Sequence, residues 1–304
     1  MVSQLSKEFI ELLKAEETDI YLDEPMTLHT SFHIGGNADC LCEVKNVEAL
    51  KHIILLCKER SVPYFILGLG SNLLVSDSGI RGVVIKLGGE FSAITPINDT
   101  MIKCGAGVTL AGLCVYARKM SLGGLEFAWG IPGSVGGAVY MNAGAYGGEI
   151  KDVVVESTYM DSNGNIRKHK ENEHDFSYRH SIYTDTDNVI LDATVRLEYK
   201  NPNVISDRMQ DLMNRRRTKQ PTNHPSAGSV FKRPEGYYAA ALIEECGLKG
   251  CTIGGAQVSP KHSGFIVNEG GATAEDVKAL IEHIKKVVRE QKGVELCCEV
   301  KFVG

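Results

Sequence analysis

The chain has 304 residues, with 33 basic and 38 acidic side chains, a formal net charge of −5 and 43% hydrophobic residues. This balance is typical of a soluble globular protein with one large domain or two, and it argues against a nucleic-acid partner. No apolar run reaches the roughly 18 residues of a membrane span, so no membrane partner is expected.

The nine cysteines form no Cys-x-x-Cys pair, and the nine histidines show no His-Glu-x-x-His spacing. We therefore expect reduced thiols in a cytoplasmic protein, and no metal site.

The first two hundred residues predict alternating helices and strands. Residues 1–17 form an amphipathic helix that is too acidic for a signal peptide, and a loop over 23–36 follows. A strand–helix–strand unit is expected over 38–44, 47–60 and 63–68. The later elements are short strands at 73–76 and 83–87, a helix at 109–120, a hairpin at 153–171 turning at Asn163-Gly164, and an alternating strand at 189–200.

A domain boundary is predicted near residue 200, where Asn201-Pro202-Asn203 interrupts the last of these strands. After it we expect helices at 204–219, 237–247 and 273–291 and strands at 264–268 and 294–303. Thr273 and Asp276 have the spacing of a capping box at the start of the long helix.

A first glycine-containing segment, LGLGSNLLVSD, follows a strand at residues 67–77. Gly68, Gly70, Ser71 and Asn72 offer unhindered backbone N–H groups, as a phosphate-binding nest would. The spacing is not that of a dinucleotide fingerprint, because a strand follows the segment instead of a helix. A phosphate site and a plain turn are equally compatible with this segment.

A second segment holds nine glycines between Gly123 and Gly148. A turn needs only one or two glycines, and long loops without secondary structure in compact domains are usually functional. We interpret the segment as a backbone that lies against a flat or anionic ligand. A flexible lid or a buried crossover is the alternative.

The predicted helix at 204–219 ends in a basic cluster. Arg216 continues the apolar stripe of Met209, Leu212 and Met213, and Lys219 lies three residues further on. A cation on a buried face needs an anionic partner, either a ligand phosphate or carboxylate or an internal salt bridge.

Ser229 lies in the stretch PSAGSVFKRP, residues 225–234. Its neighbours do not match the Gly-x-Ser-x-Gly elbow of hydrolases, and a nucleophilic serine needs a base. His224 is the nearest histidine, but two prolines lie in the same loop. From these residues alone, the default interpretation is a serine whose hydroxyl closes a turn.

Seven stretches taken together resemble one family. They are TSFHIGGNAD, GLGSNLLVSD, IPGSVGGAVYMNAGAYGGEI, FSYRHS, PSAGSVFKRP, GAQVSPKHSGFIVN and the terminal CCEVKFVG. In order, from about residue 27 to 304, they resemble the UDP-N-acetylenolpyruvoylglucosamine reductases of peptidoglycan synthesis.

The resemblance implies an α+β fold with two domains. Residues 1–200, with a core at about 27–197, would form an FAD-binding domain of the vanillyl-alcohol-oxidase (PCMH) type. Residues 201–304 would bind the substrate, with the last strand returning Glu299 to the active site. It also implies non-covalent FAD, NADPH as hydride donor and a UDP-sugar substrate. The oligomeric state is not predicted by the sequence, and a monomer is favoured.

The resemblance also assigns roles to residues. Ser229 would be the proton donor, with Arg179 and Glu299 as the other catalytic residues, and Lys219, Arg179, Gln257 and His262 would bind substrate. A serine that protonates a strongly basic enolate carbon needs no histidine base. FAD would be held by Gly68, Gly70, Ser71, Asn72, Leu73, Ile131, Gly133, Ser134, Gly136, Gly137, Asn142, Gly144 and Arg216. On the predicted last strand Glu295, Glu299 and Lys301 point to the same face, so periodicity cannot choose Glu299 over Glu295 and only the family motif selects it.

One departure from the family's longer class concerns the substrate side. Only the 39 residues 180–218 separate Arg179 from Lys219, which implies the shorter class without an inserted tyrosine-bearing lid. Position 233 is arginine where the longer class has asparagine. Contacts to the UDP moiety are therefore open, with Gln257, Lys261 and His262 as candidates.

Overall fold

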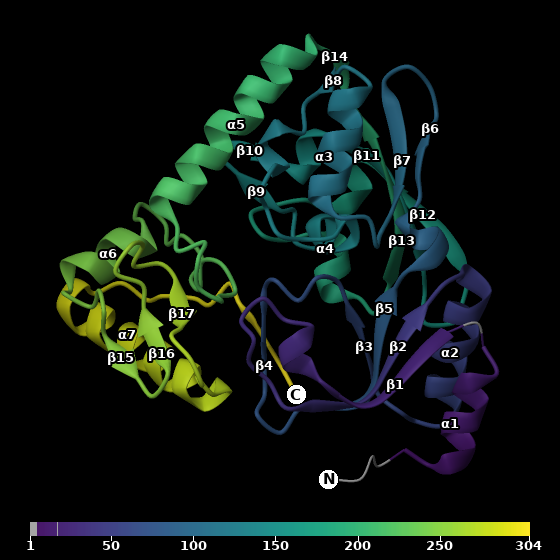
Figure 1. The fold of residues 1–304 in the computed structure, drawn as a ribbon, viewed down its shortest axis with the longest axis horizontal. Helices are drawn as coiled ribbons and strands as arrows, with labels where there is room; N and C mark the ends of the chain where they lie inside the picture. The colour runs from purple at the N-terminus through teal and green to yellow at the C-terminus, as the bar shows by residue number, and fades with distance from the viewer. Residues whose placement is uncertain (1–4, 17) are drawn as a thin grey trace. The chain divides into compact units, whose positions relative to one another are not determined.

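The computed structural model describes residues 5–16 and 18–304 (Figure 1). The chain forms two compact units, each assembled from separate stretches. The first comprises Met1–Leu22, Cys40–Leu69 and Gly82–Arg215, and the second comprises Asp23–Asp39, Gly70–Arg81 and Arg216–Gly304. The domain boundary near residue 200 stays a prediction. The compact units do not divide at one point of the chain, because the second unit also includes two short stretches from the N-terminal part, Asp23–Asp39 and Gly70–Arg81.

A four-stranded sheet has the order β1 (Thr18–Pro25), β2 (Asn37–Val44), β5 (Ile80–Leu87) and β3 (Tyr64–Leu67). Two helices, α1 (Lys7–Lys14) and α2 (Val47–Glu59), lie beside this sheet (Figure 1). Their side chains Phe9, Leu13 and Ile53 form one core cluster with Val83 and Ile85 of β5. The predicted strand–helix–strand unit is present, but β5 lies between its two strands, and β3 pairs with β5 in parallel.

A second, five-stranded sheet has the order β12 (Ile166–Lys170), β11 (Val154–Met160), β13 (Val189–Arg196), β7 (Met101–Gly105) and β6 (Ile94–Pro96). All its pairings are antiparallel. The predicted hairpin is confirmed as β11–β12, and Gly164 in its turn has φ +77°. The core beside this sheet includes residues of α3 (Leu110–Lys119) and α4 (Val135–Tyr140).

The predicted alternation of the strand at 189–200 is wrong. Strand β13 is buried at almost every position and contributes to two core clusters, with Ile190, Ala193 and Val195 in one and Val189 and Leu191 in the other. Its continuation pairs separately, as β14 (Glu198–Tyr199) with β8 (Leu122–Gly123). A further short pair, β9 (Gly144–Ala145) with β10 (Gly148–Glu149), lies in the glycine-rich segment.

The second unit contains α6 (Ala239–Glu245), α7 (Ala274–Lys292) and an antiparallel sheet of β15 (Thr252–Ile253), β16 (Ala256–Val258) and β17 (Ile266–Asn268). The predicted capping box of Thr273 and Asp276 is confirmed. Asp77, from the first glycine-containing motif, also accepts hydrogen bonds from the N–H groups of Ala274 and Glu275. Helix α5 (Pro202–Lys219) runs from the first unit into the second.

The last predicted strand is shorter than expected. Regular pairing covers only β18 (Lys301–Val303), which lies parallel to β4 (Leu73–Val75). The preceding residues run beside the Ser229 segment through an isolated bridge between Phe231 and Cys298. None of the helices in the described part of the chain has the length and apolar character needed to cross a membrane.

Candidate active site

The first glycine segment connects β3 to β4. Over the described residues, the N–H groups from Gly68 to Asn72 have no protein acceptor. Gly70 has φ +62°, and a Cβ there would lie 2.0 Å from the carbonyl oxygen of His29, so only glycine fits. This run of unused donors favours the phosphate site over the plain turn.

The second glycine segment is more regular than the sequence predicts. Residues 135–140 form helix α4, and the Ser134 hydroxyl caps it by accepting a hydrogen bond from Gly137 N–H at 3.2 Å. The N–H groups of Val135 and Gly136 donate to the carbonyls of Val108 and Ala106. The expectation of a long structureless loop is therefore wrong. The N–H groups at the start of α4 are already hydrogen-bonded within the protein and are not available to a ligand.

The glycines of this segment fall into two kinds. A Cβ on Gly136 would lie 2.9 Å from the Cβ of Ala106, so this glycine is required by packing. A Cβ on Gly137 would meet only Ser134 Oγ at 3.4 Å, and one on Gly133 only Leu110 at 3.8 Å. Gly133 and Gly137 therefore leave backbone open to a ligand.

The two glycine segments meet at one point. A Cβ on Gly68 would lie 2.8 Å from Ser134 Oγ, so the end of β3 lies against the N-cap of α4. Ile131, also predicted to hold the cofactor, is half-buried and packs against the core beside α4. Within the first unit, the open backbone of Gly133 and Gly137 therefore lies near the unused N–H group of Gly68, which fits a flat or anionic ligand.

Arg179 lies at the tip of a tight turn. Ser177 N–H donates to the carbonyl of His180, and His180 N–H donates back to Ser177, which leaves Tyr178 and Arg179 between them. Arg179 has φ +56°, a left-handed conformation that is strained for a non-glycine residue. Its guanidinium donates to the carbonyl of Gly144 at 3.2 Å and lies over the ring of Tyr178.

Asn142 is fully buried and joins the glycine segment to this turn. Its amide N–H₂ donates to Glu149 and to the carbonyl of Ser177, and its oxygen accepts from Lys151 N–H. This arrangement favours a positioning role over a direct cofactor contact. Burial acts to raise the pKa of Glu149, but hydrogen bonds from Lys151 and Asn142 and the charges of Lys151 and Arg179 outweigh it, so that pKa is lowered.

Ser229 belongs to an extended segment of the second unit that is held on both sides. Ser226 N–H donates to Ser31, and Ser31 Oγ donates to the carbonyl of Ser226 at 2.7 Å. Val230 N–H donates to Gly264, and Ser229 itself bridges Phe265. The Ser229 hydroxyl has only a weak bond of 3.3 Å to the carbonyl of Phe231. His224 lies 3.5 Å from Glu269, so it is oriented to a carboxylate.

Glu299 lies beside the Ser229 segment. Its N–H donates to the carbonyl of Val230 at 2.7 Å, and its own carbonyl accepts from the side chain of Asn72 at 3.1 Å. The structure thus brings Asn72, Glu299 and the Ser229 segment together. Glu295, which periodicity could not separate from Glu299, is exposed and lies 3.6 Å from Arg289.

The predicted substrate-binding residues of the second unit lie in three separate places. His262 packs edge-on against Phe265, and burial lowers its pKa. Because Ser229 bridges Phe265, this histidine lies close to the Ser229 segment. Gln257 donates to Thr252 on the β15–β16 pair, and Lys261 donates to the carbonyl of Arg217 at the end of α5.

The basic end of α5 follows its predicted stripe. Met209 and Leu212 are buried, Arg216 is half-buried and Lys219 is exposed. Between Arg179 and Lys219 the chain is occupied by a 3₁₀ turn, Ile182–Asp185, and by β13, β14 and α5.

Comparison with curated proteins identifies the family. The UDP-N-acetylenolpyruvoylglucosamine reductase of Caldanaerobacter subterraneus subsp. tengcongensis is 51% identical over 294 residues, which cover 97% of this chain and 96% of that protein. The chain belongs to the UDP-N-acetylenolpyruvoylglucosamine reductase family. The reductase of Clostridium perfringens is 48% identical over 299 residues, which cover 98% of this chain and 98% of that protein.

Family models and solved structures agree with this membership. An FAD binding domain model matches residues 38–170, and the reductase C-terminal domain model matches residues 220–303. The crystal structure of the reductase from Thermus caldophilus has a TM-score of 0.80 at 34% identity, over 95% of this chain and 99% of that one. The expected fold class, an FAD-binding domain with a smaller second domain, is confirmed.

A more distant neighbour shares the fold alone. The berberine bridge enzyme from Eschscholzia californica has a TM-score of 0.51 at 17% identity, over 64% of this chain and 44% of that one.

Proposed function

We propose that the protein is an NADPH-dependent flavoenzyme that reduces the enolpyruvyl ether of UDP-N-acetylglucosamine enolpyruvate to UDP-N-acetylmuramate. The observation that carries this proposal is the pairing of the Ser229 and Glu299 segments through the hydrogen bond from Glu299 N–H to the carbonyl of Val230, together with a Ser229 hydroxyl to which no histidine is bonded in the described chain. Identity of about 50% to curated reductases over nearly the whole chain supports it.

The glycine segments fit FAD. The unused N–H groups of Gly68, Gly70, Ser71 and Asn72 suit its pyrophosphate, and the open faces of Gly133 and Gly137 suit a flat group. The proposed FAD-binding set is completed by Leu73, Ile131, Ser134, Gly136, Asn142, Gly144 and Arg216. Of these, Gly136 acts through packing and Asn142 through hydrogen bonds. When bound, FAD supplies the hydride chemistry that links NADPH to the double bond of the substrate. No histidine or cysteine lies in residues 68–73 or 131–144, so the cofactor is held non-covalently.

Three side chains of this chain carry the rest of the reaction. Arg179 stabilises the negative charge that develops on the substrate carboxylate, because a fixed cation aimed at developing charge is a large source of rate. Ser229 then gives its proton to the α-carbon. Glu299, with its backbone fixed by Asn72 and Val230, orients the reacting groups or a water molecule.

Lys219 is assigned to the substrate, and Gln257 and His262 to its UDP part, with residues 201–304 as the substrate-binding domain. Lys261 is the weakest of the earlier candidates, since its ammonium already donates to the end of α5. We also propose a monomer in the cytoplasm. None of the nine cysteines, all of which lie in the described residues, forms a disulfide, which suits a reducing compartment.

The proposal is tested by steady-state turnover under argon. Beyond the single equivalent that reduces the bound flavin, the holoprotein should oxidise NADPH only when UDP-N-acetylglucosamine enolpyruvate is present, and the product should carry two more hydrogens by mass spectrometry. A flavin oxidase would instead need oxygen. Full FAD content without substrate-dependent NADPH oxidation would refute the proposed function.

A further inference from the structure

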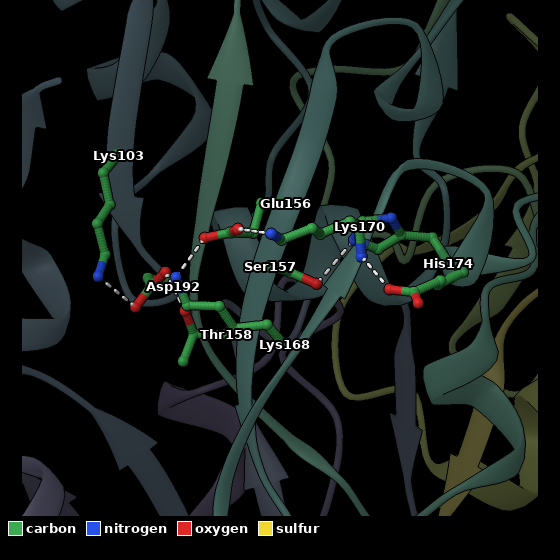
Figure 2. A network of polar contacts seen from close by, with 9 residues as sticks. Lys103, Glu156, Ser157, Thr158, Lys168, Lys170, His174 and Asp192 are labelled. Atoms are coloured by element: carbon green, nitrogen blue, oxygen red, sulfur yellow. Dashed lines mark hydrogen bonds and ion pairs between the residues drawn. The ribbon is translucent and has the colours of Figure 1, made fainter. Parts of the chain in front are cut away.

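A chain of buried hydrogen bonds in the first unit includes none of the residues assigned above. Ser157 on β11, His174 and Tyr183 are almost completely inaccessible to solvent. Ser157 Oγ lies 2.8 Å from His174 Nε2 and 2.6 Å from the hydroxyl of Tyr183. His174 Nδ1 lies 2.8 Å from the carbonyl oxygen of Glu171. Figure 2 shows Ser157 and His174 within the surrounding polar network.

The direction of each hydrogen bond follows from the partners. A carbonyl oxygen only accepts, so Nδ1 of His174 carries the ring proton and Nε2 accepts. Ser157 therefore donates to His174, and Tyr183 donates to Ser157. The pKa of His174 is lowered, mainly by burial, which keeps the ring neutral as this pattern requires.

The members of this chain hold both ends of the turn that carries Arg179. His174 precedes Arg179 by five residues and Tyr183 follows it by four, and both are tied to the same residue of β11. Between them Phe176 stacks on His174 with ring centroids 4.8 Å apart, and the buried Ser181 hydroxyl donates to the carbonyl of Tyr140. A residue at φ +56° keeps that conformation only when its surroundings over-determine it.

We propose that Ser157, His174 and Tyr183 are positioning residues that hold Arg179 in its strained, catalytically competent conformation. This inference rests on the proposed function, in which Arg179 acts on the substrate carboxylate. The three residues touch neither substrate nor cofactor in this account. They act by fixing the two ends of a turn whose tip would otherwise relax.

The test is a double-mutant cycle in which the rates of the two half-reactions are measured by anaerobic rapid mixing. Tyr183→Phe removes one hydroxyl from the chain and keeps the ring. We expect unchanged FAD content, unchanged bleaching by NADPH, and re-oxidation by the enolpyruvyl substrate that is slower by roughly 3- to 10-fold, the worth of one hydrogen bond. In an Arg179→Ala background the same change should have almost no further effect, because the group being positioned is gone.

Tyr159→Phe is the matched control. Tyr159 is a buried tyrosine on β11, the strand of Ser157; it stacks on His169, and its hydroxyl forms no hydrogen bond in the described structure. This variant should re-oxidise at the parent rate. A second readout is binding: calorimetry should show weaker binding of UDP-N-acetylmuramate, whose carboxylate Arg179 would contact, to Tyr183→Phe than to Tyr159→Phe. Ser157→Ala should reproduce the effect of Tyr183→Phe.

The outcomes separate the two claims. The positioning role is refuted if Tyr183→Phe slows both half-reactions equally or re-oxidises at the same rate as Tyr159→Phe. It is also refuted if Tyr183→Phe slows re-oxidation by the same factor in the Arg179→Ala background as in the parent. In each of these cases the proposed function stands. If the parent holoprotein is bleached by NADPH but not re-oxidised by the enolpyruvyl substrate, the proposed function itself falls, and this inference falls with it.

Discussion

At the scale of single residues, Ser229 shows how a proton donor can be fixed without a base. Its segment is hydrogen-bonded to Gly264 on one side and to Cys297 and Glu299 on the other, while its own hydroxyl has only a long bond to Phe231. The backbone is therefore rigid and the hydroxyl is free to turn toward a ligand. This combination suits an acid that donates once per turnover.

Replacing Ser229 with alanine should separate the two half-reactions. FAD binding and reduction by NADPH use no proton from this residue and should stay near the parent rate. Re-oxidation by the enolpyruvyl substrate should slow by about 10²- to 10⁴-fold, the usual contribution of a positioned acid. Ser229→Cys should recover part of the rate, since a thiol also donates a proton. Equal slowing of both halves in rapid-mixing absorbance would assign Ser229 a structural role.

Two adjacent glycines should respond differently to valine. The sequence treats Gly136 and Gly137 alike, as parts of one cofactor loop. In the structure a side chain on Gly136 collides with Ala106, whereas one on Gly137 would meet only Ser134 Oγ, at the ordinary contact distance of 3.4 Å. Gly136→Val should therefore lower the thermal midpoint and the soluble yield. Gly137→Val should stay folded and lose FAD, measured by the ratio of flavin to protein absorbance. Full flavin content in folded Gly137→Val would remove this glycine from the cofactor site.

At the scale of secondary-structure elements, apolar periodicity predicted the long helices and the β11–β12 hairpin correctly. It missed β1, where polar and apolar residues do not alternate cleanly and only Met26 beyond it is deeply buried. It also overextended the last strand, because partners on the Ser229 segment, distant in sequence, interrupt regular pairing before Lys301. Helix α4 was missed because two of its six residues are glycines, and its stability comes from the Ser134 cap and from packing on Ala106.

His174, which lies in the 3₁₀ turn Glu171–His174 before the Arg179 turn, should make the free energy of unfolding depend on pH. Burial is the main cause that lowers the pKa of His174, with the nearby charge of His169 acting in the same direction and Glu173 opposing it. The unfolded chain, with a histidine pKa of about 6.5, then binds the proton more readily than the folded one. The stability that neutral His174 contributes is present above that value and is lost as the pH falls through the lower folded-state pKa.

Thermal unfolding between pH 7.5 and 5.5 measures this effect. Over this interval the thermal midpoint should fall further for the parent protein than for His174→Gln, which has no titrating group at position 174. His283→Gln, on the exposed face of α7, should follow the parent. Carboxylates titrate mostly below this window, so they contribute little to the difference. Parallel curves for the parent and His174→Gln would contradict the buried neutral state of this histidine.

At the scale of the whole molecule, the family motifs predicted the fold class, the cofactor and the chemistry, because each motif is long and specific. The composition of the compact units could not be predicted. Residues 23–39 and 70–81 join the second unit through tertiary contacts, such as those of Asp77 with α7 and of Asn72 with Glu299, for which no local pattern exists. Asn72 and Asn142, which the motifs assign to the cofactor, also fix other parts of the chain, Asn72 by its bond to Glu299 and Asn142 by its bond to Ser177.

The central claim is that one bound flavin serves both NADPH and the enolpyruvyl sugar. Its most direct test is a two-stage absorbance experiment on the purified yellow protein under argon. We expect NADPH to bleach the flavin band near-stoichiometrically, and UDP-N-acetylglucosamine enolpyruvate, added after excess NADPH is removed, to restore the band and yield UDP-N-acetylmuramate. A colourless protein, or a bleached flavin whose band returns only when oxygen is admitted, would show that no such shared flavin exists.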